Sequence, residues 1–287
     1  MTKIGFIGLG IMGAPMAAHL ADAGHQVTGH IRRPNAGRRL IDAGGTTSTT
    51  IAGTVADADV VITMLPNHPE VEEVVDGALA HIRTDALLID MSSIRPETSI
   101  RIAERYPRSL DAPVSGGQTG AENATLAIMI GGDADDVAAA RPLFDVLGKT
   151  IVHVGPHGAG QTVKAANQLV VGGIYALVSE AIVLLEASGV DARAGLDVLA
   201  GGLAGSKILD LKRASMLDRE FTPGFRIDLH HKDMGIAIDA ARQAGVALPV
   251  TGLVAQLMAA ARAMGFGSLD HSALLRVVES LSGKGKG

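Results

Sequence analysis

Lys164 and Asn167 are the residues of this sequence whose types and spacing most directly suggest chemistry. They lie in the stretch 158–168, where a glycine-rich turn leads into an apolar run with the composition of a helix. Residues three apart share one face of a helix. A lysine carried into apolar surroundings can act as a proton donor, because burial destabilises its charged form. The alternative is a lysine that faces solvent, so the neighbouring elements have to be considered.

The apolar run extends to about residue 188, and it predicts a long helix over 161–188. At 1.5 Å per residue such a helix would be about 40 Å long, enough to join two domains. Strand-like and helix-like segments alternate before it, whereas only helix-like segments follow it. The sequence therefore predicts an α/β fold: a Rossmann-type, doubly wound domain over 1–160 and an all-helical domain over 161–287 that begins with the long helix.

A glycine-rich turn follows the first apolar run, which covers residues 4–7. A helix is expected from residue 14 to residue 23, so strand, turn and helix follow one another as in the dinucleotide-binding fingerprint. The first glycine allows the tight turn, the second lets the backbone approach a pyrophosphate, and the third allows close packing of helix on strand. The predicted cofactor-binding residues of this turn are Gly8, Leu9, Gly10, Ile11, Met12 and Gly13.

Two arginines follow the second expected strand, residues 27–30, at the place where a carboxylate would bind the ribose of NAD. Arg32 and Arg33 can instead form charge-assisted bidentate contacts with a 2′-phosphate. The sequence therefore predicts NADP(H) as the preferred cofactor, with NAD(H) as the other possibility. The alternative is that both arginines belong to a solvated turn.

Continuous apolar runs at 60–65 and 86–90 are typical of strands in a parallel sheet that is covered on both faces. Ligands of open α/β sheets gather at the carboxyl ends of the strands. We therefore expect the residues that follow these two runs to line the nicotinamide side of the cofactor site: Leu65, Pro66, Asn67 and Ser93.

Two further segments could bind a small carboxylate substrate. In Ser115-Gly116-Gly117, successive backbone N–H groups and a hydroxyl can form an anion site, unless the segment is an ordinary surface loop. Lys232-Asp233 lies near the expected start of a helix and could instead be a structural ion pair or cap. His230-His231 lacks further ligands at metal-binding spacing, so no metal site is predicted.

Composition excludes several classes of function. A net charge of −5, with two tyrosines, five phenylalanines and no tryptophan, does not favour nucleic-acid binding. No uninterrupted run of 18 apolar residues suggests a membrane span. The absence of cysteine excludes disulfides and thiolate chemistry, and it agrees with a cytoplasmic protein. The chain starts directly with an expected strand, so no signal peptide is expected. Apolar faces in the second half favour a homodimer or homotetramer.

Four blocks in a fixed order resemble the β-hydroxyacid dehydrogenase family: residues 5–13 with Pro15-Met16, residues 111–117, residues 160–167, and Lys232-Asp233. The resemblance covers essentially the whole chain. It implies that a nicotinamide cofactor serves the reduction of small carboxylate-bearing aldehydes or the oxidation of 3-hydroxyacids. Members that use NAD often carry an acidic residue where this chain has Ile31, which bears on the choice of cofactor.

Carried over by position, the resemblance makes Lys164 the catalytic acid, with Asn167 orienting the substrate. It assigns the substrate carboxylate to Ser115, Gly116 and Gly117. Lys232, next to the cofactor, would close the substrate pocket together with Asp233, and Phe225 is a further candidate substrate contact.

Finer blocks at 201–206, 216–219, 223–230 and 269–272 resemble members that reduce tartronate semialdehyde (2-hydroxy-3-oxopropanoate) to D-glycerate. Three alternatives stay open: a 3-hydroxyisobutyrate dehydrogenase or another reductase of small carboxylate-bearing semialdehydes in the same family, a reductase of cyclic imines, and a non-catalytic NADP-binding sensor. A sensor would need no proton donor, and an imine reductase is not expected to have a lysine at the start of the long helix.

Overall fold

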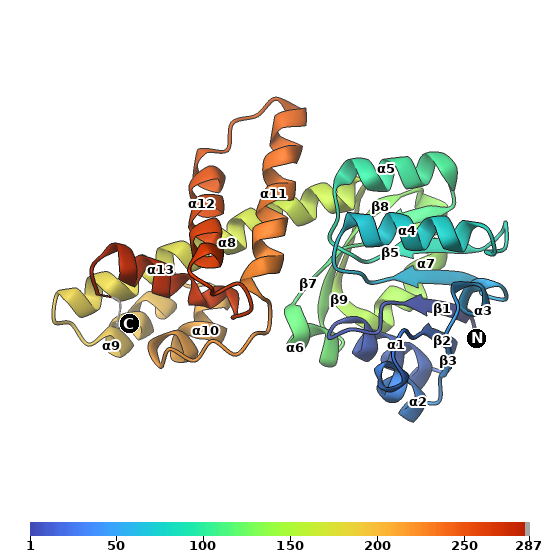
Figure 1. Ribbon diagram of the computed structural model, residues 1–287, viewed down its shortest axis with the longest axis horizontal. Helices are drawn as coiled ribbons and strands as arrows, with labels where there is room; N and C mark the ends of the chain where they lie inside the picture. Colours follow the sequence, from blue (N-terminus) through green and yellow to red (C-terminus); the bar gives the residue numbers. More distant parts are fainter. Residues whose placement is uncertain (285–287) are drawn as a thin grey trace. The chain divides into compact units, whose positions relative to one another are not determined.

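The computed structural model describes residues 1–284, and the chain divides into two compact units between Lys164 and Ala165. The helix α8 (Ala159–Ala187) runs without a break through this boundary. The sequence placed the boundary at residue 160 and the long helix at 161–188. Figure 1 shows the first unit in blue to green and the second in yellow to red.

The first unit contains a nine-stranded sheet within the described residues, in the order β3-β2-β1-β4-β5-β6-β8-β7, with β9 paired to β8. The strands from β3 to β6 are parallel, β8 is antiparallel to both β6 and β7, and β9 is parallel to β8. The strands are β1 (Lys3–Ile7), β2 (Gln26–His30), β3 (Thr46–Ser48), β4 (Val60–Thr63), β5 (Leu87–Asp90), β6 (Ser109–Asp111), β7 (Val114–Ser115), β8 (Leu126–Gly132) and β9 (Gly148–Gly155).

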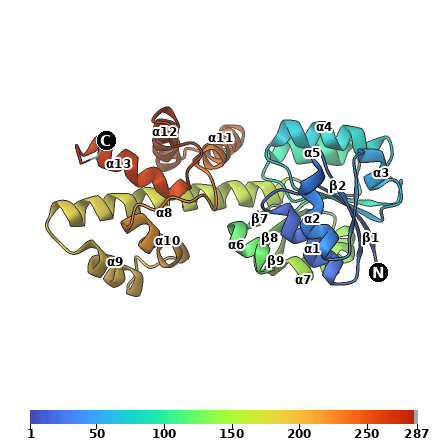
Figure 2. The ribbon, with the colours of Figure 1, turned by 60° about the horizontal axis from the view of Figure 1, so that its bottom comes forward.

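Helices cover both faces of this sheet (Figure 2). Neighbouring residues of one strand point to opposite faces, so Val61 joins the apolar cluster of α4 and α5 while Ile62 joins that of α1 and α7. Two buried layers therefore enclose the strands, which confirms the doubly wound domain. Its helices are α1 (Gly13–Asp22), α2 (Arg38–Asp42), α3 (Ile51–Val55), α4 (His68–Leu79), α5 (Pro96–Arg105), α6 (Gly117–Glu122), α7 (Ala134–Leu147) and the 3₁₀ turn η1 (Pro34–Gly37).

The second unit is helical throughout its described residues, as predicted. Its apolar core includes Tyr175 and Ile182 of α8, Leu196 of α9, Met234 of α11 and Met258 of α12. Besides the larger part of α8, its elements are α9 (Ala192–Gly201), α10 (Lys207–Leu217), α11 (Ile227–Ala244), α12 (Pro249–Ala263), the 3₁₀ turn η2 (His271–Ala273) and α13 (Leu274–Leu281).

Short elements are those that the sequence did not predict. β3, α2, α3, β6, β7 and α6 have between two and six residues each, too few to show a period of apolar residues. The strand expected at 60–65 ends at Thr63.

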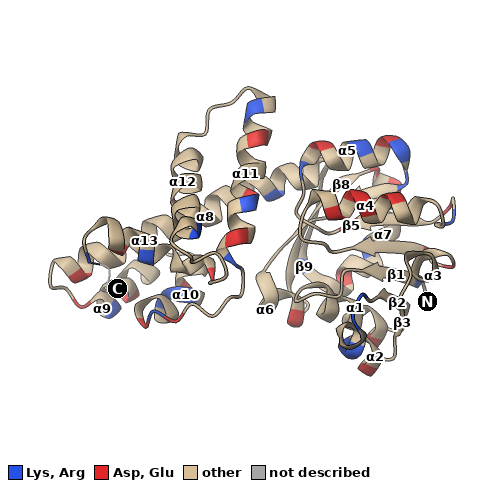
Figure 3. Ribbon diagram, viewed as in Figure 1, with Lys and Arg blue, Asp and Glu red and all other residues tan. Residues whose placement is uncertain are grey.

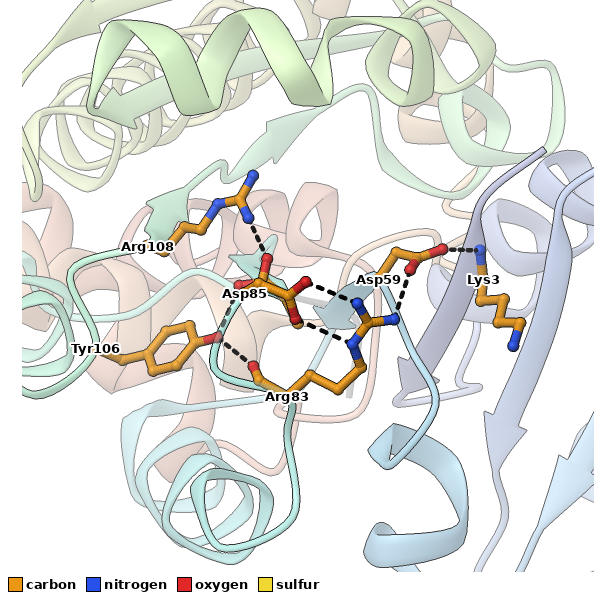
Figure 4. A network of polar contacts seen from close by, with 7 residues as sticks. Lys3, Asp59, Arg83, Asp85, Tyr106 and Arg108 are labelled. Carbon is orange, nitrogen blue, oxygen red and sulfur yellow. Dashed lines mark hydrogen bonds and ion pairs between the residues drawn. The ribbon is translucent and has the colours of Figure 1, made fainter.

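Charged and polar side chains join the amino ends of three parallel strands (Figure 4). The backbone N–H of Lys3 donates to Asp59 at 2.9 Å, and Arg83 donates to the other oxygen of Asp59 at 3.0 Å. The Tyr106 hydroxyl lies 2.9 Å from the Arg83 carbonyl and 2.7 Å from the Ala86 carbonyl, just before β5. Partly exposed side chains therefore connect the strands at the amino edge of the sheet.

The helix α8 is long and apolar enough to cross a membrane by length and composition alone, with a mean hydropathy of 1.9 over an 18-residue stretch of which 33% is buried. It nevertheless contains buried polar side chains, among them Gln161 and Gln168, that hydrogen-bond within their own units. These bonds satisfy polar groups of α8 inside the protein.

Candidate active site

The glycine turn between β1 and α1 has the geometry expected of the dinucleotide fingerprint. Gly8 has φ +112°, and a Cβ there would lie 2.2 Å from the Met64 carbonyl oxygen. A Cβ at Gly13 would lie 2.0 Å from the Gly8 carbonyl oxygen. No atom lies within 4 Å of a Cβ built on Gly10. Packing therefore requires the first and third glycines, whereas the second leaves open space in front of the backbone.

The amino end of α1 offers backbone donors to an anion. Its N-cap residue, Met12, forms no side-chain cap, and the first turn has no acidic residue. Ile11 is exposed and Leu9 half-buried beside this turn. The Ala14 N–H is already bonded to the Gly10 carbonyl at 2.9 Å and Pro15 has no N–H, so donors to an anion would come from the residues before Ala14, and the helix dipole favours a phosphate there. The residues present therefore fit the pyrophosphate of a dinucleotide cofactor, which agrees with the predicted role of residues 8–13.

Arg32 and Arg33 directly follow β2, and both side chains are exposed. The preceding residue, Ile31, donates its N–H to the Ser48 carbonyl at 2.9 Å, which extends the pairing of β2 with β3 by one residue. The turn that carries the two guanidinium groups is thus anchored at its start. Their contact with a 2′-phosphate stays a prediction.

The carboxyl edge of the sheet carries the residues expected on the nicotinamide side. The Leu65 N–H donates to the Ser92 hydroxyl at 2.8 Å, which links the segments after β4 and β5. Asn67 is the N-cap of α4, and its Oδ1 accepts from the His68 N–H at 2.9 Å. Pro66 and Ser93 lie in the same two segments. The structure thus brings all four predicted residues to one edge, and it gives the Asn67 side chain a capping role that sequence reasoning missed.

Polar residues end three neighbouring parallel strands at this edge. Thr63, Asp90 and Asp111 are paired in register at the ends of β4, β5 and β6, and all three are buried. The Thr63 hydroxyl donates to Asp90 Oδ1 at 2.8 Å, and the Ser92 N–H donates to the same oxygen at 3.2 Å. Buried polar groups that are hydrogen-bonded in this way give an edge one defined geometry.

The Asp111 carboxylate caps the start of α8 from a neighbouring strand. It accepts the Gly158 N–H at 2.7 Å and the Gln161 N–H at 2.9 Å, one on each oxygen. Burial raises the pKa of the Asp111 carboxyl from its ordinary 3.8 to about 6, although both N–H donors oppose the rise and nearby Asp90 adds to it. A Cβ at Gly160 would lie 2.8 Å from Asp111 Oδ2, so only glycine allows this approach.

Gln161, like Asp111, was not among the site residues predicted from the sequence. Its side chain is 1 % exposed. Its amide NH₂ donates to the Ser92 carbonyl at 2.9 Å, and its oxygen accepts the Ile94 N–H at 3.1 Å. The amide thus holds both residues that flank Ser93. A polar residue three positions before Lys164 in an apolar helix was the available signal.

Lys164, the predicted catalytic acid, lies in the second turn of α8 and is 8 % exposed. The alternative of a solvent-facing lysine is therefore wrong. Gln161 and Lys164 are three residues apart, so the residue that holds the Ser93 segment and the lysine share one side of the helix.

Ser115, Gly116 and Gly117 connect β7 to α6, and both glycines have positive φ, +140° and +59°. A positive φ at both positions favours glycine, because other residues adopt it at a cost in free energy. The side chain of Ser115 is half-buried. Binding of a substrate carboxylate at this segment stays a prediction.

A chain of polar contacts joins three predicted residues in the second unit. The Asn167 amide donates to Gln168 Oε1 at 2.8 Å, and the Gln168 amide donates to Asp233 Oδ2 at 2.5 Å. The Lys232 ammonium lies 3.0 Å from Asp233 Oδ1, and the Asp233 side chain is 3 % exposed. The Lys232–Asp233 ion pair therefore forms, and Gln168 is the connecting residue that the sequence did not indicate.

Phe225 belongs to an aromatic cluster of the same unit. Its ring meets the edges of His230 and His271 at centroid distances of 5.9 and 5.3 Å. The Nδ1 atoms of the two histidines are 3.0 Å apart, so one donates and the other accepts. Asp270 accepts the Phe225 N–H at 3.2 Å. Packing within the unit thus accounts for Phe225, and its contact with substrate stays a prediction. No cluster of metal-binding side chains occurs within residues 1–284.

A glycine turn between a strand and a helix, at the switch point of a doubly wound sheet, is typical of a dinucleotide-binding domain. Residues 3–155 match the family described as the NAD binding domain of 6-phosphogluconate dehydrogenase. Residues 158–278 match the family described as NAD-binding of NADP-dependent 3-hydroxyisobutyrate dehydrogenase.

Full-length relatives agree with these matches. The chain is 40% identical to 2-hydroxy-3-oxopropionate reductase of Escherichia coli (strain K12), over 98% of both chains. It is 35% identical to 2-(hydroxymethyl)glutarate dehydrogenase of Eubacterium barkeri, over 98% of this chain and 96% of the relative. The solved structure of Mycobacterium tuberculosis 3-hydroxyisobutyrate dehydrogenase with L-serine has a TM-score of 0.88 and 36% identity, covering 97% of this chain and 99% of that one.

The chain belongs to the β-hydroxyacid dehydrogenase family and is an NAD(P)-dependent oxidoreductase that acts on CH–OH groups. This confirms the family predicted from the four sequence blocks. It also favours an enzyme over a non-catalytic sensor.

A Gly10→Ala variant separates folding from cofactor binding. Because its Cβ meets open space, we expect the denaturation midpoint to stay near that of the wild type. Binding of NADPH, measured by fluorescence titration, should weaken by about 1–3 kcal/mol, the usual cost of forcing a methyl group into a packed contact. Gly13→Ala is the control and should unfold more easily. If the NADPH affinity of Gly10→Ala were unchanged, the pyrophosphate of the cofactor would not bind against this turn.

Proposed function

We propose that the protein reduces tartronate semialdehyde to D-glycerate with NADPH, and that Lys164 is the general acid. The observation that carries this proposal is a lysine 8 % exposed in the second turn of α8. The helix start before it is held by Asp111 and Gln161. The 40% identity with 2-hydroxy-3-oxopropionate reductase supports the choice of substrate.

The reaction joins a hydride and a proton to one carbonyl group. When bound, a nicotinamide cofactor would supply the hydride that adds to the aldehyde carbon. Lys164 donates a proton to the aldehyde oxygen as negative charge develops there, and it then recovers a proton from solvent. A positive charge beside an oxyanion stabilises the transition state more than the ground state. The products are the alcohol and the oxidised cofactor.

The other candidate residues position the substrate. Backbone N–H groups of Gly116 and Gly117 and the Ser115 hydroxyl bind its carboxylate. Asn167 orients its hydroxyl or aldehyde group, and Gln168 fixes the Asn167 amide through the 2.8 Å bond. Lys232 carries a positive charge for the anionic ligands while Asp233 holds its ammonium at 3.0 Å. A fixed geometry of this kind replaces the entropy otherwise lost on bringing the reactants together.

The substrate is the finer part of the proposal. Relatives of similar identity are named for different small acids, so a panel of aldehydes is the direct test. We expect the highest kcat/KM for NADPH oxidation with tartronate semialdehyde, followed by methylmalonate and succinic semialdehydes, and none with a cyclic imine. The Lys164→Ala variant should lose a factor of roughly 10²–10⁴ in kcat on the best substrate, the usual contribution of a general acid.

NADPH affinity, measured in the same preparations, should be unchanged in Lys164→Ala. Lys149→Ala, which removes an exposed lysine on β9, is the control and should retain wild-type kcat. Full turnover by Lys164→Ala would refute the role of the lysine. A higher kcat/KM for methylmalonate semialdehyde would favour the alternative, a 3-hydroxyisobutyrate dehydrogenase.

The preference for NADP(H) over NAD(H) rests on Arg32 and Arg33. Replacing both arginines by alanine should lower kcat/KM for NADPH by roughly 10- to 100-fold, because a hydrogen bond to a charged group contributes about 1.5–3 kcal/mol. The value for NADH should hardly change. Arg38→Ala, an exposed cation on α2, controls for general electrostatic attraction. Equal decreases in kcat/KM for NADPH and NADH would show that the arginines do not bind the 2′-phosphate.

We also propose that the chain forms a homodimer or homotetramer through α8. Val163, Val170, Leu177 and Leu184 recur every seven residues on this helix, and all four are exposed. Figure 3 shows few charged residues along α8. A twofold axis between residues 173 and 174 would place Val170 against Leu177 of an antiparallel copy. Apolar residues at a seven-residue interval form the seam of paired helices.

Leu177→Glu should therefore shift the molar mass in sedimentation velocity to a smaller species, because a charge in the seam has no partner. Leu211→Glu, an equally exposed leucine on α10, should leave the mass unchanged. An unaltered mass of Leu177→Glu would exclude this face. The cytoplasmic location predicted from the sequence stays a prediction for cell fractionation.

A further inference from the structure

Both hydrogen-bonding atoms of the Gln161 amide are used on one segment, residues 92–94. The NH₂ group donates to the Ser92 carbonyl at 2.9 Å, and the oxygen accepts the Ile94 N–H at 3.1 Å. The side chain is 1 % exposed and Ser92 is fully buried. Water therefore does not compete for these bonds. A primary amide facing one carbonyl and one N–H in this way acts as a two-point clamp on the residue between them, Ser93.

The backbone of Gln161 is fixed as well. Its N–H donates to Asp111 Oδ2 at 2.9 Å, while the other oxygen of Asp111 accepts from Gly158. Asp111 is the last residue of β6, and Ser92 follows β5, the strand next to it. Gln161 is thus bound through its main chain to one strand end and through its side chain to the segment after another.

Lys164 lies three residues further on the same helix, and it belongs to the same compact unit as Ser93 and Gln161. Within an α-helix, the position of one residue fixes that of the residue one turn away. The clamp therefore determines where the lysine stands relative to the segment expected beside the nicotinamide. Without it, the helix start would still be held by the main-chain cap on Asp111 and by the 2.9 Å bond between His157 and the Ser109 carbonyl, but its side-chain link to residues 92–94 would be lost.

We propose that Gln161 is a positioning residue for the reduction, one that sets the place of the Lys164 ammonium against the Ser93 segment without touching the substrate. This inference rests on the proposed role of Lys164 as general acid. Proton and hydride transfer depend steeply on distance, and a misplacement of about 1 Å can cost on the order of 10²-fold in rate. The loss should therefore appear in the chemical step and not in cofactor binding.

Gln161→Met tests the proposal, because methionine has a similar length but cannot form either hydrogen bond. We expect kcat to fall about 10- to 100-fold, with the dissociation constant for NADPH within a few-fold of the wild type. The kinetic isotope effect with NADPH deuterated at the transferred position should rise, since hydride transfer becomes slower than product release.

Tyr106→Phe is the matched control for lost stability. It removes contacts of one side chain with two backbone carbonyls at the amino end of β5, whereas Gln161→Met removes two at the carboxyl end (Figure 4). Tyr106→Phe should lower the melting temperature while retaining kcat per folded molecule. If Gln161→Met also retained kcat per folded molecule, within about twofold, the proposal would be overturned.

Gln161→Glu keeps the test decisive if the methionine variant does not fold. A protonated carboxyl can donate to the Ser92 carbonyl and accept from Ile94, as the amide does, whereas a carboxylate can only accept. Burial and the nearby Asp111 both raise the pKa of the new carboxyl group. The ratio of the variant's kcat to that of the wild type should therefore increase as the pH falls from 8 to 6. A ratio that stays constant or falls would contradict the clamp.

Lys164→Ala, assayed in parallel, separates this inference from the proposed function. Loss of turnover in both Lys164→Ala and Gln161→Met supports both roles. Loss in Lys164→Ala with normal kcat in Gln161→Met overturns the positioning role alone. Full turnover in Lys164→Ala overturns the general acid and, with it, the inference that depends on it.

Discussion

The capping of α8 by Asp111 is the interaction on which the arrangement of the candidate site depends. A carboxylate at the amino end of a helix satisfies backbone donors that have no partner inside the helix and opposes the positive end of the helix dipole. Here the carboxylate comes from the end of a strand, not from the residue before the helix. The cap therefore joins the sheet to the helix that carries Lys164, and it does so at the edge where Rossmann-type domains bind their cofactors.

The two edges of the sheet are stabilised in different ways. Arg83 and Asp59 at the amino edge are each over two-fifths exposed, so salt and water weaken their attraction. At the carboxyl edge, Thr63, Asp90 and Asp111 are almost fully buried, and their bonds have defined partners. Burial raises the pKa of the Asp111 carboxyl because it destabilises the charged form. The buried carboxylates, whose burial is unfavourable for the charged form, therefore lie at the carboxyl edge of the sheet, where the positions of the candidate site residues have to be fixed.

The sequence predicted the fold well because long elements carry periodic patterns. The first strand, the glycine turn and α1 follow from spacing alone, as do α8 and the helices after it. The buried network could not be predicted in the same way. Asp90 and Asp111 are neighbours only because two strands separated by a helix end in register, and a single sequence does not show register. Gln168 was hidden for a related reason, since its partner Asp233 lies 65 residues further along the chain. The cap that Asn67 forms on the next residue is local, by contrast, and Asn67 itself was predicted for another role.

The unbroken course of α8 limits how this chain can change in length. Each residue added to a helix turns everything after it by about 100°. One extra residue between Gln161 and Lys164 would leave Gln161 clamped to the Ser92–Ile94 segment and turn the position of the lysine by about 100° around the helix axis, although both residues belong to the first unit. Insertions should therefore be tolerated better in connections such as residues 202–206, between α9 and α10. The number of residues from Gln161 to Lys164, by contrast, matters as much as the identity of the two residues.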